Sequence, residues 1–176
     1  MNTRLLIAIL LAHCAGAYAA PIPFSANLGG AGEVPPNASP GTGTTVVTYD
    51  AAVHMLNVQI VFAALTGTTA ASHIHCCVGT PGSGTAGVAT QLPTFSSFPL
   101  GVTSGTYSMS FDLTMSASWN PTFVTGNGGT VATAEAAFAS ALTNGTAYLN
   151  IHSSTAPGGE IRGFLTSDVV FANGYE

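Results

Sequence analysis

Three histidines have a spacing that transition-metal sites use. His73 and His75 are two residues apart, so on a β-strand both project from one face while Ile74 between them points to the other. His152 follows Ile151 in the same way, with the isoleucine expected on the core side. Two imidazoles from one strand and a third from a neighbouring strand form a ligand set used for Zn²⁺ and Cu²⁺. The sequence therefore predicts a copper or zinc site at these outward-facing histidines.

Two cysteines directly after His75 are candidate additional ligands. Cys76 and Cys77 could bind a soft metal as thiolates, and Cys77 would project beside His75 if the strand continued that far. Adjacent cysteines can instead form a disulfide with each other, pair with another chain or remain reduced. A simpler interpretation of the histidines also stays open, in which they are hydrogen-bonded surface residues that fix loops.

A second polar group surrounds Arg162. Glu160 and Arg162 share one face of a predicted strand, with Ile161 between them on the core side. We expect the guanidinium to form an ion pair or to bind backbone carbonyls, because a single arginine among acids finds an internal partner. Glu33, just before two prolines, is an expected acceptor. Contact of Arg162 with a ligand carboxylate is the alternative.

The sequence predicts no catalytic residue. No serine lies in a Gly-x-Ser-x-Gly motif, which marks the nucleophile of many hydrolases. The few acidic residues are spread widely along the chain, unlike the carboxylate pair of a glycosidase. Apart from copper or zinc, we expect no cofactor.

Short alternating segments must position these residues. Apolar and polar side chains alternate with a period of two, which is typical of half-buried strands. The segments are 22–28, 43–49, 56–62, 70–75, 107–115, 147–152 and 160–166. One short helix is expected near 133–143, where Thr133 can cap a run of good helix formers. This pattern favours an all-β fold, an antiparallel β-sandwich or a partly open barrel.

The beginning of the chain is typical of an export signal. Arg4 precedes an unbroken apolar run at 5–12 that is too short to span a bilayer, and small residues at 17 and 19 suit signal peptidase. We therefore expect a signal peptide at 1–19, one domain at 20–167 and a C-terminal tail at 168–176, in a secreted or periplasmic protein. A lipoprotein signal with Cys14 as the lipidated residue is the alternative, although His13 stands where that signal has a small residue.

The charge and the hydropathy of the chain each exclude one class of partner. The chain has two Lys or Arg residues, and removal of the signal peptide leaves Arg162 alone against seven acids. Such a chain has no basic patch for phosphates, so we expect no nucleic-acid binding. We also expect no membrane insertion, because no later apolar run is long enough for a transmembrane helix. The expected partner is an extracellular or periplasmic ligand or protein that the sequence does not name.

An ordered set of motifs resembles the CHRD domain, a module named after chordin and widespread in bacterial secreted proteins. The matching segments are FSANL at 24–28, EVPP at 33–36, AASHIH at 70–75, AYLNIH at 147–152 and GEIRG at 159–163. The resemblance implies an immunoglobulin-like β-sandwich or barrel, but no firmly shared biochemical activity. Cys76 and Cys77 depart from the family pattern, which more often has a cysteine-free, Gly-rich turn at this point.

Three functions follow as expectations. The first is a secreted CHRD-type binding module that holds copper or zinc through the histidines. The second is a small copper oxidoreductase, because the His-x-His pair also resembles the copper ligands of copper–zinc superoxide dismutase. The third is a structural protein of the cell surface or extracellular matrix. An enzyme is the less favoured expectation, since no further ligand set completes a bimetallic site.

Overall fold

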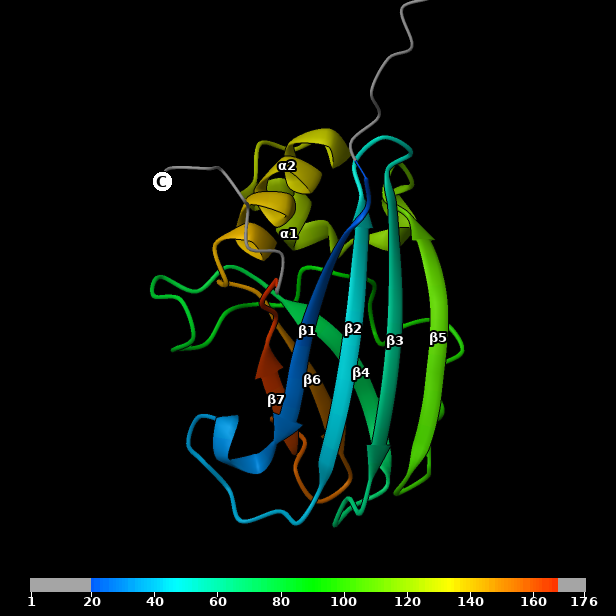
Figure 1. The fold of residues 1–176 in the computed structure, drawn as a ribbon, viewed down its shortest axis with the longest axis vertical. Coiled ribbons are helices and arrows are strands. Elements are labelled where there is room, and N and C mark those ends of the chain that lie inside the picture. The colour runs from blue at the N-terminus through cyan, green and yellow to red at the C-terminus, as the bar shows by residue number, and fades with distance from the viewer. Residues whose placement is uncertain (1–19, 168–176) are drawn as a thin grey trace, which may run out of the picture.

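A computed structural model describes residues 20–167, which build one curled antiparallel sheet and two short α-helices (Figure 1). The expected signal peptide at 1–19 and the expected tail at 168–176 lie outside the described residues. The sheet has seven strands in the order β4-β6-β7-β1-β2-β3-β5.

All seven predicted strands are confirmed, and so is the all-β fold class. Each predicted segment overlaps one strand of the sheet. The strands are β1 (Ile22–Gly29), β2 (Thr42–Asp50), β3 (Met55–Ala63), β4 (Thr69–His75), β5 (Gly105–Asp112), β6 (Tyr148–Ser153) and β7 (Ile161–Phe164). β5 ends before the predicted position 115, because the chain turns there and the Met115 backbone N–H donates to the Asp112 carbonyl.

The curl of the sheet encloses the core. Figure 1 shows β4 and β6 behind β1 and β2, with β7 beside β1, so that the inner faces of the two halves oppose each other. One cluster of buried side chains combines residues from both halves, among them Ile74 of β4, Leu149 of β6 and Val58 of β3. These three side chains have no exposed surface, as expected for the apolar positions of the period-two pattern.

Two helices cover one end of the sheet, at the top of Figure 1. The predicted helix is confirmed as α2 (Val131–Thr143), but Thr130 caps it and Thr133 is its partner in a capping box. The shorter α1 (Pro121–Gly126) was not predicted, and Asn120 caps it. Two 3₁₀ turns, Gly30–Gly32 and Ser116–Ser118, complete the described elements.

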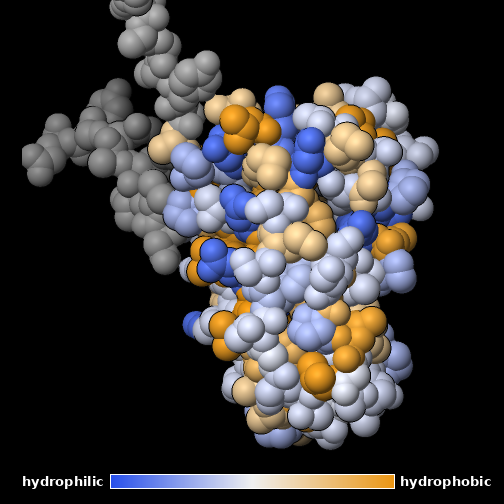
Figure 2. Space-filling model, turned by 90° about the vertical axis from the view of Figure 1, so that its right-hand side faces the viewer, coloured by the Kyte–Doolittle hydropathy of each residue, from blue (hydrophilic) through white to orange (hydrophobic). Residues whose placement is uncertain are grey.

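Among the described residues, no helix has the length and apolar character needed to cross a membrane. Figure 2 shows the side of the molecule that carries β5, where hydrophobic residues form small separate groups among polar ones.

Candidate metal centre

The three histidines lie on adjacent strands. β4 and β6 pair antiparallel, with His75 opposite Tyr148, His73 opposite Asn150 and Ala71 opposite His152. Residues that are directly opposite in a ladder project from the same face of the sheet. The imidazoles therefore lie on one face, and Ile74 and Ile151 fill the core from the other.

The imidazoles converge. One nitrogen of each of the three rings lies within 4.8 Å of the corresponding nitrogen of the other two, and the ring centroids are 5.3 to 5.9 Å apart. In a tetrahedral site, two nitrogens that bind one metal at about 2.1 Å each lie about 3.4 Å apart. Metal binding thus requires the widest pair, now within 4.8 Å, to close by up to about 1.4 Å.

A backbone carbonyl holds the other nitrogen of each ring. Nε2 of His73 lies 2.6 Å from the Pro93 oxygen, Nδ1 of His75 lies 2.9 Å from the Ala86 oxygen, and Nδ1 of His152 lies 2.9 Å from the Pro157 oxygen. A carbonyl only accepts hydrogen bonds, so each of these nitrogens carries the proton. The inward nitrogens then carry a free lone pair, and histidine ligands are oriented in this way in metalloproteins.

The electrostatics keep the rings neutral. Burial lowers the pKa of all three histidines, and that of His75 falls to about 4. The carbonyl hydrogen bonds act in the opposite direction, but burial is the larger effect. Neutral imidazole is the form in which histidine can act as a metal ligand.

Loops cover the face on which the histidines lie, although the sequence predicted that they point outward. The segment 76–100 runs along the free edge of β4, where the Ala89 N–H donates to the Ile74 carbonyl and the Phe95 N–H to the Ser72 carbonyl. Phe95 itself is fully buried in the core and anchors this segment. As a result His73 is only 6% exposed. The histidines point away from the core; His73 is buried, whereas His75 and His152 are half-buried.

Tyr148 and Arg162 form a stack behind His75. The phenol ring lies 4.8 Å from the imidazole, nearly parallel at 7°. The Arg162 guanidinium lies 4.6 Å from the centroid of the Tyr148 ring, within the range of a cation–π interaction. Tyr148 and Asn150 were not predicted as site residues, although the period-two pattern places both on the same strand face as His152.

Glu33 and Arg162 form a buried pair beside the histidines. Nε of Arg162 lies 3.8 Å from Oε2 of Glu33 and also donates to the Gly32 carbonyl. Nδ2 of Asn150 donates to Oε1 of Glu33 at 2.8 Å. Burial raises the pKa of Glu33 to about 7, whereas the charge of Arg162 and the hydrogen bond from Asn150 favour the ionised carboxylate.

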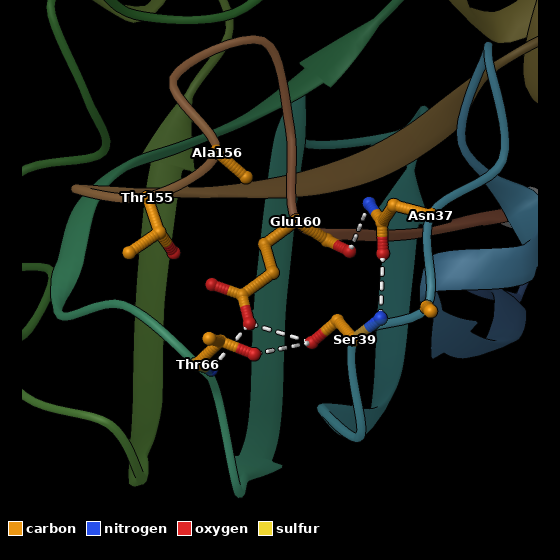
Figure 3. A pocket seen from close by; sticks show the side chains of 7 residues that line it. Asn37, Ser39, Thr66, Thr155, Ala156 and Glu160 are labelled. Atoms are coloured by element: carbon orange, nitrogen blue, oxygen red, sulfur yellow. Dashed lines mark hydrogen bonds between the residues drawn. The ribbon is translucent and has the colours of Figure 1, made fainter.

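Glu160 does not join this pair. Its carboxylate accepts hydrogen bonds from the Ser39 hydroxyl at 2.6 Å and from the backbone N–H groups of Thr66 and Gly67. Figure 3 shows the carboxylate turned towards Ser39 and Thr66 in a surface pocket of about 300 Å³. The carboxylate there ties three segments together through these bonds.

The structure does not bring the cysteines to the histidines. β4 ends at His75, and the sulfurs of Cys76 and Cys77 are bonded to each other. Cys76 is buried in the apolar core, whereas Cys77 is exposed. Among residues 20–167, the candidate metal-binding group contains the three histidines alone. His54 lies elsewhere, with Nδ1 2.9 Å from the Glu135 carboxylate.

The described residues thus form a small domain with one curled β-sheet and three converging imidazoles on its outer face. The family model of the CHRD domain matches residues 24–165, and the chain belongs to that family. The resemblance seen in the sequence motifs is thereby confirmed, and it supports a binding module of unspecified function. No curated protein and no solved structure matches the chain.

Proposed function

We propose that the protein is an exported CHRD-domain binding module that holds one copper or zinc ion through His73, His75 and His152. One observation carries the proposal. His73 Nδ1, His75 Nε2 and His152 Nε2 are buried without a hydrogen-bond partner, and one ring nitrogen of each of these histidines lies within 4.8 Å of one nitrogen of the other two.

Burial of unpaired nitrogens is unfavourable. An unsatisfied buried polar group costs about 1–3 kcal/mol, and this cluster contains three such nitrogens. Fixing loops through hydrogen bonds accounts for only one nitrogen of each ring. A metal ion would satisfy the three remaining nitrogens at once. Metal binding therefore explains more of the geometry than the alternative in which the histidines only fix loops.

The three imidazole donors limit which metal ions can be the occupant. Three neutral imidazoles with no carboxylate among them suit Cu²⁺ and Zn²⁺, whereas Ca²⁺ and Mg²⁺ prefer oxygen ligands. The cysteines are bonded to each other and offer no thiolate in this state. Copper or zinc is therefore the proposed occupant.

Metal analysis of the purified protein tests the site. After equilibration with Cu²⁺ or Zn²⁺ and removal of the free ion, we expect about one metal per chain, and none in the double variant His73→Ala/His152→Ala. His54→Ala is the matched control, because it removes an imidazole outside the cluster, 51% exposed, and it should bind as the wild type does. Stoichiometric binding that survives the double variant would refute the ligand assignment.

A copper oxidoreductase is the second candidate function. Three protein ligands leave a coordination position open, which is the arrangement of catalytic metal sites rather than structural ones. A superoxide dismutation assay of the copper-loaded protein separates the two candidates. Absence of activity above that of the double variant would remove the enzyme and leave the binding module.

A further inference from the structure

A fourth unsatisfied atom belongs to Asn150, which lies on the same strand face as the histidines. Within residues 20–167, the buried side-chain nitrogens and oxygens that have no hydrogen-bond partner are His73 Nδ1, His75 Nε2, His152 Nε2 and Asn150 Oδ1. All four belong to paired residues of β4 and β6 or to their neighbours on the same face. Their common location indicates a common cause.

Asn150 occupies the centre of this face. It lies directly opposite His73 in the ladder and two residues before His152 on the same strand. Directly opposite residues have Cβ atoms about 5 Å apart. Asn150 is 2% exposed, so bulk water does not satisfy its amide oxygen.

The orientation of the amide is determined by Glu33. Nδ2 donates to Oε1 of Glu33 at 2.8 Å, and Arg162 lies on the same carboxylate. The ionised carboxylate, which the charge of Arg162 favours, only accepts hydrogen bonds, so the amide nitrogen faces it and the amide oxygen faces away from it. The oxygen can only accept a hydrogen bond, so the group that satisfies it has to be a donor.

Resting on the proposed metal site, we infer that a water or hydroxide ligand completes the coordination of the metal and donates a hydrogen bond to Asn150 Oδ1. A metal alone would satisfy the three imidazole nitrogens and leave the amide oxygen unpaired. A solvent ligand in the open position satisfies it, because metal binding makes water a stronger donor. One metal with one such ligand thus satisfies all four atoms.

This arrangement selects the class of small ligand that the metal accepts. Oxygen ligands that carry a hydrogen, such as water, hydroxide or hydroperoxide, can donate to Asn150. Anions without a hydrogen, such as azide, cannot, and they bring a negative charge towards the amide oxygen. Asn150 is therefore a specificity-determining residue of the metal site.

The copper-loaded protein tests this inference with azide as the probe. Asn150→Leu keeps a similar shape but removes the acceptor, and we expect it to retain about one copper per chain. Azide should bind this variant about fivefold more tightly than the wild type, the factor that corresponds to one lost hydrogen bond to the competing water. Asn57→Leu makes the same chemical change on β3, away from the site, and should leave azide affinity unchanged.

A measurement on the wild type keeps the test independent of how the variant folds. Pulsed electron–nuclear double resonance of the Cu²⁺ form should detect the strongly coupled proton of a solvent molecule bound to the copper, which disappears in D₂O and differs from the weakly coupled exchangeable protons on the remote imidazole nitrogens. Any one of three results would overturn this inference alone. They are copper without such a solvent proton, coordination of copper by the amide oxygen itself, and unchanged azide affinity in Asn150→Leu. Failure of the wild type to bind copper or zinc would overturn the proposed function and the inference together.

Discussion

Each imidazole of the cluster has one nitrogen bound to a carbonyl and one nitrogen turned inward. The carbonyls come from Pro93, Ala86 and Pro157, and all three belong to loops. Because a carbonyl cannot donate, the loops determine which nitrogen of each ring carries its lone pair. The orientation of the proposed ligand nitrogens therefore depends on the loops as much as on the histidines.

The lowered histidine pKa values predict retention of metal in mild acid. Protons and metal compete for the same nitrogens, so release begins when the pH approaches the pKa of the ligands. An ordinary histidine has a pKa near 6.5, and burial lowers that of His75 to about 4. Zinc release followed during acid titration should therefore start below about pH 5.5. Release centred between pH 6 and 7 would contradict the lowered pKa values.

In β4 and β6, core residues alternate with site residues, so that one face of each strand packs in the core and the other carries the histidines. The inner residues Ile74, Leu149 and Ile151 have no exposed surface, and the outer residues carry the imidazoles. Pro157 follows His152 by five residues, and the turn after β6 brings its carbonyl back to the imidazole. Each strand thus holds its site residues rigidly because its opposite side is packed.

Truncation of the inner side should therefore weaken the fold. Ile74→Ala creates a cavity beneath His73 and His75, and we expect a loss of about 2–5 kcal/mol in the free energy of unfolding. Chemical denaturation of the metal-free protein measures it. Val61→Ala on the outer side of β3, where Val61 is 55% exposed, is the control and should cost less than about 1 kcal/mol. Equal losses in the two variants would show that β4 is not part of the core.

Helix α1 was missed for a physical reason. It has six residues, among them two threonines and a terminal glycine, so intrinsic propensity does not favour it. Packing stabilises it instead, because Phe123 stacks against Trp119 with ring centroids 5.9 Å apart, and both are buried. Such contacts depend on the rest of the fold and leave no periodic pattern in the sequence.

For the whole molecule, a metal would join segments that are distant in the sequence. The histidines lie on β4 and β6, and the carbonyls that orient them lie in the segments after each strand. A ligand that binds only the native state stabilises all of it by mass action. Metal binding should therefore raise the stability of the whole domain.

Calorimetry tests this coupling. At a free metal concentration a hundred times the dissociation constant, the gain is about 2.7 kcal/mol, which corresponds to a rise in Tm of about 5–10 °C for a domain of this size. His73→Ala/His152→Ala should give no rise. A similar rise in this double variant would mean that the metal binds elsewhere.

The sequence by itself determined the strands, their inner and outer faces and the family, because side-chain direction along a strand is a local property with a period of two. It therefore placed the three imidazoles on one kind of face. Only the tertiary structure decided that they converge, that loops cover them, and that Glu33 rather than Glu160 contacts Arg162. These outcomes depend on strand register and loop path. Both are set by contacts between residues far apart in the chain, which local patterns do not specify.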